Sequence, residues 1–132
     1  MKYLLDTNVC IQILKGTSDR IKSKIATIPN EKINIPSVVR YELFYGAYKS
    51  NNPEKTLSLI TEFLDTFDTA EFNDDVAQIC GKIRASLEKR GEPIGPYDLM
   101  IAATAMKSDY VLVSNNTREF HRIESIKLED WQ

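Results

Sequence analysis

The chain has 132 residues, of which 27% are charged and 42% hydrophobic, and its formal net charge at pH 7 is −2. A chain of this length is expected to form one domain with one sizeable core, so residues 1–132 are interpreted as a single domain. Charges of both signs are mixed along the sequence, which excludes a polybasic tail and leaves any nucleic-acid contact to a local basic patch.

Several classes of protein are excluded by composition. No stretch approaches the ~18 apolar residues that a membrane span needs, and the apolar run after Lys2 is broken at Asp6, too early for a secretory signal. Cys10 and Cys80 are far apart and fit no CxxC pattern, so both are expected to be reduced. The single histidine, His121, excludes histidine-based zinc motifs. We therefore expect a cytoplasmic protein with no membrane association.

The first predicted element is a short buried strand at residues 2–5, which leads directly into Asp6. Thr7 and Asn8 then begin a helix over residues 7–15. Asp6 is therefore placed at a strand end, where open α/β sheets bind their ligands. Asp6 also has a structural interpretation, since an aspartate at this position can simply cap the helix.

A second helix is expected from Ser18 to about residue 28, and a second strand at 33–36. Ser37 is predicted to cap a helix that runs to Ala47. Residues at the spacing i, i+3, i+4, i+7 share one face of this helix, and here that face combines one acid with apolar or small residues. These are Val38, Val39, Glu42, Tyr45 and Gly46. A carboxylate in such a stripe needs a partner, so Glu42 is a candidate functional residue.

The second half of the chain continues the alternation of helices and strands. The remaining predicted elements are a helix at 54–67, a strand within 66–72, a helix at 73–90, a helix at 97–106 opened by Pro96, a strand at 110–113, and an edge strand or cap at 123–128. Asp98 lies in the first turn of the 97–106 helix, where it could equally serve as a partner of the helix dipole. The whole pattern predicts a three-layer α/β/α domain with a short, mostly parallel central sheet.

Three acids and one polar loop can meet at one edge of the sheet if the strand-to-helix loops open there. They are Asp6, Glu42, Asp98 and the loop Ser114–Asn116. Three carboxylates ~4 Å apart repel by about 4 kcal/mol per pair at an effective dielectric of ~20. Protonation could relieve this repulsion, but the three motifs have no adjacent Lys or Arg, which favours a divalent cation. Oxygen ligands without histidine or thiol select Mg²⁺, or Mn²⁺, and so indicate phosphodiester hydrolysis. Ser114 and Asn116 can also be read as turn residues.

Four segments resemble the motif regions of the PIN domain, and specifically the VapC-type toxins of type II toxin–antitoxin systems. They are LLDTN at 4–8, VVRYELFYGA at 38–47, PYDLMIAATA at 96–105 and LVSNNTREF at 112–120. The resemblance runs in order across the whole chain. It implies a PIN-like fold and an Mg²⁺-dependent endoribonuclease that cleaves structured RNA, with tRNA as one candidate, to leave a 5′-phosphate.

By this resemblance, Asp6 and Asp98 would hold the metal, and Glu42 would orient or deprotonate the attacking water. Many PIN domains have a fourth acid where this chain has Asn116, so a second metal site is left open. Asn116 could still order water or a phosphate through hydrogen bonds. Five basic residues are candidates for RNA contact: Lys15, Arg40, Lys82, Arg84 and Arg118.

The resemblance also implies a homodimer and a cognate VapB-type antitoxin. Apolar residues of the first helices are candidates for the antitoxin groove, although core packing explains them equally well: Ile11, Leu14, Leu43 and Phe44. Three alternatives remain at this point. The first is a haloacid-dehalogenase phosphatase, which needs a second acid at the position of Asn8. The second is a receiver-like signalling module, which needs a lysine in place of the Ser114 loop. The third is an inactive PIN-like binding module, and the three retained acids argue against it.

Overall fold

The fold is built on a five-stranded sheet with the strand order β3-β2-β1-β4-β5. The computed structural model describes residues 1–132. Its strands are β1 (Tyr3–Leu5), β2 (Ile33–Pro36), β3 (Asp68–Ala70), β4 (Val111–Val113) and β5 (Lys127–Glu129). Every neighbouring pair is parallel, which confirms the predicted sheet and makes the end of the chain an edge strand.

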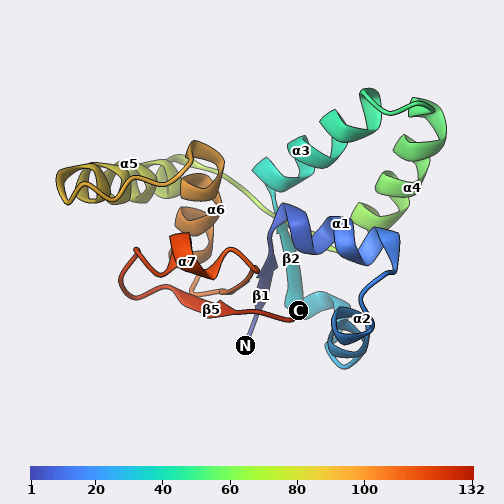
Figure 1. Cartoon of the computed structure of the whole chain (residues 1–132), viewed down its shortest axis with the longest axis horizontal. Coiled ribbons are helices and arrows are strands. Elements are labelled where there is room, and N and C mark those ends of the chain that lie inside the picture. The colour runs from blue at the N-terminus through green and yellow to red at the C-terminus, as the bar shows by residue number, and fades with distance from the viewer.

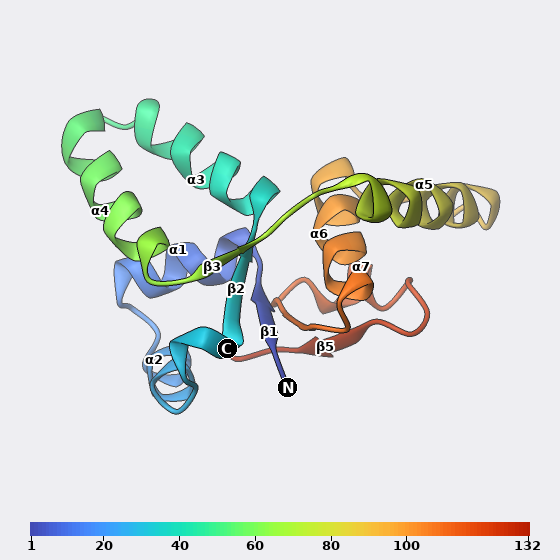
Figure 2. The same ribbon diagram turned by 180° about the vertical axis from the view of Figure 1, so that it is seen from behind.

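Helices flank this sheet on both sides. They are α1 (Thr7–Lys15), α2 (Asp19–Ala26), α3 (Ser37–Tyr48), α4 (Pro53–Asp65), α5 (Asp74–Lys89), α6 (Pro96–Lys107) and α7 (Thr117–Phe120), with a 3-10 turn at Asn30–Lys32. The α3–α4 hairpin projects on one side of the strands and the α5–α6 pair on the other, in both views (Figures 1 and 2). The predicted three-layer α/β/α architecture is confirmed.

Local capping chemistry sets where several helices begin. Four side chains accept a hydrogen bond from the backbone N–H three residues further on: Asp6, Ser18, Asn52 and Asn73. Ser37 does not cap α3 as expected; it is the first helical residue, and its hydroxyl donates to the carbonyl of Ala70 at 3.5 Å. The sequence analysis also missed α7, because four residues are too few to show a helical period.

The core is formed by the strands and the inner faces of the helices. Leu4, Leu5, Ile35 and Leu112 are fully buried in it. Burial of such side chains contributes roughly 1.5–3 kcal/mol each relative to exposure. Both cysteines are free, in line with the expectation that they are reduced; Cys10 is buried and Cys80 is partly buried. None of the helices is both long enough and apolar enough to span a membrane.

The prediction of an apolar stripe on α3 was wrong for the outer half of the helix. Val38 and Val39 are buried beside the sheet, but Tyr45 is 57% exposed. The reason is that α3 extends away from the sheet beyond its first turns and packs on α4 instead (Figure 1). That packing buries Leu43 and Ala47, which lie on a different face of the helix.

The strand order creates a crevice between β1 and β4. The chain adds β2 and β3 on one side of β1 before it crosses to add β4 and β5 on the other. Connections therefore diverge at the carboxyl ends of β1 and β4, the position at which open α/β sheets bind ligands. Asp6 follows β1 directly, Ser114 follows β4, and the N–H of Asp6 donates to the carbonyl of Val113 at 3.2 Å.

Candidate active site

A cavity of about 350 Å³ opens at this crevice. Its lining comes from the start of α1, from α3, from the start of α6 and from the loop after β4: Asp6, Thr7, Asn8, Glu42, Gly95, Pro96, Tyr97, Asp98, Ile101 and Asn116. The four residues named as the candidate site from sequence, Asp6, Glu42, Asp98 and Asn116, all lie in this lining. We call this cavity the acidic pocket.

Asp6 both caps a helix and faces the acidic pocket. Its Oδ1 accepts a hydrogen bond from the N–H of Val9 at 2.9 Å, and only 5% of the residue is exposed. Burial raises the pKa of the Asp6 carboxyl, while the Ser114 hydroxyl and the backbone of Val9 oppose the shift. The structural and the functional interpretations of Asp6 are therefore compatible.

Glu42 is held by a residue from another helix. The Thr7 hydroxyl donates to Oε1 of Glu42 at 2.8 Å, which joins the first turn of α1 to the middle of α3. This hydrogen bond supplies the partner that a half-buried carboxylate needs. It leaves Oε2 of Glu42 with no hydrogen-bond partner in the chain and therefore available for water or substrate.

Asp98 lies beside a fourth acid that the sequence analysis missed. The amide nitrogen of Asn116 donates to Oδ2 of Asp98 at 3.2 Å and to Oε2 of Glu119 at 3.1 Å. Burial and, next, the charge of Glu119 raise the pKa of Asp98 to about 6, with smaller contributions from Asp6 and Glu42. The signal for Glu119 was its i+3 spacing from Asn116, which places both on one face of a helical turn.

The donor set of the pocket fits a hydrated hard cation. No three Asp, Glu, His or Cys side chains form a group close enough to enclose one metal ion. Mg²⁺ does not need such a cage, because it keeps several waters and is commonly bound by one or two carboxylates. Asp6 and Asp98 are two oxygen donors of this kind. Burial is the main cause of their raised pKa values, and the charge of neighbouring acids adds to it, so a bound cation would favour the ionised carboxylates.

The basic residues considered for RNA contact do not line the acidic pocket. Arg40 instead has a structural role, because its guanidinium donates to the carbonyls of Leu64 at 3.3 Å and Phe67 at 2.8 Å. These hydrogen bonds tie α3 to the end of α4, so Arg40 has a structural role outside the acidic pocket. Arg84 pairs with Glu88 on the exposed face of α5.

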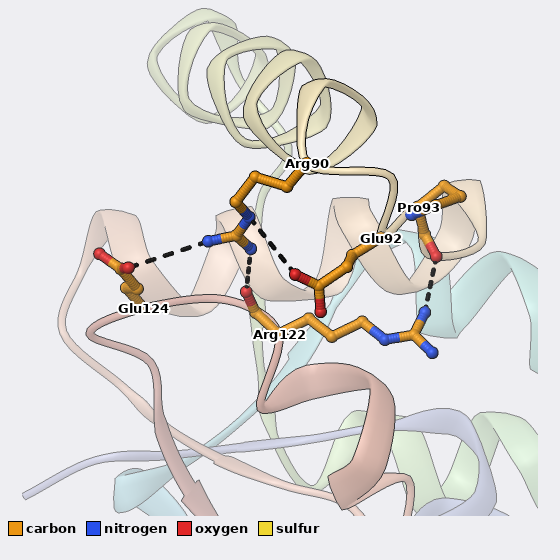
Figure 3. Close-up of polar contacts among 5 residues, drawn as sticks. All are labelled: Arg90, Glu92, Pro93, Arg122 and Glu124. Atoms are coloured by element: carbon orange, nitrogen blue, oxygen red, sulfur yellow. Dashed lines mark hydrogen bonds and ion pairs between the residues drawn. The ribbon is translucent and has the colours of Figure 1, made fainter.

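Two arginines hold the loop that precedes α6 (Figure 3). Arg122 donates to the carbonyl of Pro93 at 2.8 Å, and Arg90 donates to the carbonyl of Arg122. Arg90 also lies 3.8 Å from a carboxylate oxygen of Glu92 and 3.8 Å from one of Glu124. The network joins the end of α5 and the segment after α7 to the loop that delivers Asp98.

An apolar groove lies next to the acidic pocket and shares Glu42 with it. The groove is lined by residues of α1, α3 and α4: Ile11, Leu14, Lys15, Glu42, Leu43, Gly46, Thr56, Leu59 and Ile60. Three of the four residues considered for an antitoxin groove are included. Phe44 is not, and packs against the core instead.

Comparison with known proteins gives a consistent result. The sequence profile of the PIN domain matches residues 3–126. The chain is 39% identical over 131 residues to "tRNA(fMet)-specific endonuclease VapC" of Shigella flexneri, a match that covers 99% of this chain and 98% of the relative. It is 37% identical over 131 residues to "Ribonuclease VapC2" of Haemophilus influenzae, with the same coverage.

Solved structures agree with this match. The VapC-like chain in the crystal structure of DNA-bound VapBC from Salmonella typhimurium superposes with a TM-score of 0.94 at 39% identity, covering 100% of this chain and 99% of that one. The corresponding chain of VapBC2 from Rickettsia felis, bound to a promoter DNA fragment, gives a TM-score of 0.92 at 34% identity, with 100% of both chains covered. This chain therefore belongs to the PIN-domain family, in the group of VapC ribonucleases.

Proposed function

We propose that this protein is an Mg²⁺-dependent endoribonuclease and the toxin of a VapBC-type toxin–antitoxin pair. The observation that supports the proposal most directly is that one pocket is lined by three acids from three different helices. Asp6 caps α1, Glu42 lies within α3, and Asp98 lies in the first turn of α6. Membership of the PIN family argues against the receiver and dehalogenase alternatives. Mn²⁺ has the same ligand preferences and is the alternative ion.

In this proposal Asp6 and Asp98 hold the metal ion. A bound Mg²⁺ supplies polarisation of the scissile phosphate and a lower pKa for a coordinated water. Asp6 is fixed for this role by its backbone hydrogen bond to Val113 and its capping bond to Val9. Asn116 bridges Asp98 and Glu119 and so orients Asp98 toward the pocket.

Glu42 acts on the attacking water. Its Oε1 is occupied by the Thr7 hydroxyl, so Oε2 is the oxygen that accepts a hydrogen bond or a proton from water. Because Thr7 bonds to one oxygen and leaves the other free, the hydrogen bond fixes the orientation of the carboxylate. Such positioning of a water and a phosphate contributes to catalysis by removing orientational freedom before the reaction.

The substrate is structured RNA, and tRNA is the most specific candidate. Relatives from Shigella flexneri and Salmonella typhimurium are named for cleavage of tRNA(fMet), at 39% identity over 131 residues. Cleavage of a tRNA loop requires the pocket to admit one phosphodiester and its neighbours. The acidic pocket opens at the protein surface, and Asn8 and Tyr97 in its lining are exposed.

The partners that follow from this function are a VapB-type antitoxin and a second copy of the chain. The apolar groove beside Glu42 is suited to an amphipathic antitoxin segment, which would approach the acidic pocket from α1 and α3. Neighbouring structures are VapBC complexes from Salmonella typhimurium and Rickettsia felis. A toxin acting on tRNA works in the cytoplasm, where we place this protein.

The test is cleavage of total small RNA by the purified protein with Mg²⁺ or with EDTA, alongside Asp98→Asn. We expect cleavage with Mg²⁺ alone, loss of cleavage in EDTA, and loss in the variant. The expected loss is roughly a hundredfold, about 3 kcal/mol of transition-state stabilisation. Cleavage that persists in both controls refutes the metal mechanism, and an absence of any cleavage supports the inactive binding module.

A further inference from the structure

Four exposed tyrosines lie along one face of α3 and at the start of α6, beginning at the acidic pocket. Tyr41, Tyr45 and Tyr48 are spaced i, i+4 and i+7, so they share one face of α3. Their exposed fractions are 52%, 57% and 66%, and that of Tyr97, in the first turn of α6, is 43%. We call these four residues the tyrosine stripe. Single exposed aromatics are common on monomers, but a contiguous group indicates a binding surface.

The stripe is connected to the candidate catalytic acids. Tyr41 immediately precedes Glu42, and Tyr97 immediately precedes Asp98. The hydroxyls of Tyr41 and Tyr97 lie 3.3 Å apart, and their rings meet edge to face with centroids 5.8 Å apart at 72°. Tyr97 also lines the acidic pocket. The pair therefore stands at the mouth of the pocket, between the two helices that carry the acids.

The outer part of the stripe combines an aromatic face with a positive charge. Lys49 places its ammonium 5.0 Å from the ring centroid of Tyr45. Tyr45 and Tyr48 lie about 6 Å and 10 Å along the helix axis from Tyr41, from the rise of 1.5 Å per residue. An extended ligand that leaves the acidic pocket along α3 would meet rings first and then a cation.

An RNA strand that enters an acidic pocket needs nearby groups that attract it, such as aromatic rings and positive charges. The carboxylates that bind metal repel the phosphates on either side of the scissile bond, and no basic side chain lines the pocket. Stacking of bases on aromatic rings supplies attraction that does not depend on phosphate charge, worth about 1–3 kcal/mol per base. Bases inside a duplex are already stacked, so only unpaired nucleotides can use such a surface.

We propose that the tyrosine stripe is a stacking platform for unpaired bases of the RNA strand next to the scissile phosphate. This proposal rests on the proposed ribonuclease function and narrows its substrate class to RNA whose cleaved bond is flanked by unpaired nucleotides. The competing occupant is a second copy of this chain. The observations favour RNA because two of the rings adjoin the acids and because Lys49 provides a phosphate partner beside Tyr45.

The experiment measures RNA binding separately from cleavage. All variants carry Asp98→Asn so that RNA is not consumed, and the probe is a fluorescein-labelled single-stranded RNA of about ten nucleotides, within the range of known stacking sites. We expect Tyr45→Ala to weaken binding by about tenfold, which corresponds to 1.4 kcal/mol at about 25 °C. Tyr45→Phe keeps the ring and is expected to bind within about twofold of the parent. Gln78→Ala, at an exposed neutral residue of α5 that lies outside the acidic pocket and the apolar groove, is the control and is expected to have no effect.

A second probe identifies stacking. The same RNA with abasic positions lacks the bases, so Tyr45→Ala and the parent are expected to bind it equally. Equal binding of the normal RNA by Tyr45→Ala and Gln78→Ala overturns the platform. A fall in molecular mass in Tyr45→Ala by sedimentation, with unchanged RNA affinity, assigns the stripe to a second copy of the chain and also overturns it.

The two proposals fail in different ways. If Asp98-intact protein cleaves RNA with Mg²⁺ while the tyrosine variants bind normally, only the platform is refuted. If the intact protein does not cleave RNA but Tyr45→Ala still weakens binding, the ribonuclease function is refuted and the platform remains as an RNA-binding surface.

Discussion

The amide nitrogen of Asn116 lies 3.2 Å from Oδ2 of Asp98 and donates a hydrogen bond to it. The same nitrogen reaches Glu119 at 3.1 Å, so one neutral side chain lies between two acids. A donor between like charges favours their ionised forms and so opposes the repulsion. Many PIN domains have an acid at the position of Asn116. This chain has a bridging amide there instead, and the carboxylate of Glu119 follows three residues later.

Replacing Glu119 with Gln should move the acidic limb of the pH–rate profile to lower pH. The charge of Glu119 is, after burial, the largest contribution that raises the pKa of Asp98 to about 6. Removing that charge lowers the pKa of Asp98, so the carboxylate stays ionised in more acidic solution. The measurement is the initial rate of cleavage between about pH 5 and 8. Glu62→Gln, at an exposed acid of α4 outside the pocket, is the control, and an unchanged profile in Glu119→Gln would contradict the assigned cause.

Asp98→Asn should stabilise the metal-free protein at neutral pH. The folded-state pKa of Asp98, about 6, exceeds its ordinary value of 3.8, so the folded protein takes up a proton between these values that the unfolded chain does not hold. The ionised carboxylate therefore lowers stability above pH 6, and this penalty fades as the pH falls toward 4.

The check is thermal unfolding at several pH values. We expect the Tm of Asp98→Asn to exceed that of the parent by a few degrees at pH 7 in EDTA, and the difference to shrink toward pH 4. Added Mg²⁺ should raise the Tm of the parent and leave that of the variant unchanged, because a ligand that binds only the folded state stabilises it. A lower Tm for the variant at neutral pH would be inconsistent with a destabilising ionised carboxylate.

Thr7→Val should reduce kcat and leave KM nearly unchanged. The substitution removes the 2.8 Å hydrogen bond that holds Oε1 of Glu42. A carboxylate that loses its orientation positions water less often, and a hydrogen bond to a charged group is worth about 1.5–3 kcal/mol, which corresponds to a loss of roughly tenfold to a hundredfold. Thr7→Ser keeps the hydroxyl and should retain most activity. Single-turnover cleavage rates of Thr7→Val and Thr7→Ser distinguish these outcomes. Equal rates for the two variants would show that Thr7 does not position Glu42.

Arg122→Leu should lower stability and activity together. Arg122 donates to the carbonyl of Pro93 at 2.8 Å, in the loop that leads into α6 and Asp98. The free energy of unfolding should fall by about 1 kcal/mol for the lost hydrogen bond, and kcat should fall because the start of α6 is less fixed. Denaturant unfolding and cleavage rates measure the two effects.

The matched control for Arg122 is Arg84→Leu. Arg84 bonds only to Glu88, and 65% and 55% of the two side chains are exposed, so its loss should leave the free energy of unfolding nearly unchanged. If Arg122→Leu behaves like Arg84→Leu, the loop before α6 is held by its own packing and not by the arginine network.

Much of the fold and of the candidate site follows from local patterns in the sequence. Short apolar runs predicted β1 and β4. The strand that ends at Asp6, before helix-starting residues, predicted both the cap and the position of this acid at the carboxyl end of the sheet. Pro96 likewise opens α6 two residues before Asp98. These features depend on neighbours in the chain, so periodicity and capping chemistry are sufficient to predict them.

Only the tertiary structure decided which side chains meet. The order of the strands brings the end of β1 beside that of β4, and this places Asn116 and Glu119 against Asp98. The packing of α3 on α4 turned Arg40 to two backbone carbonyls and left Tyr45 exposed. The physical reason is that helical and strand periods determine which face of an element is apolar, whereas its neighbours in space depend on crossover connections and packing between residues far apart in sequence.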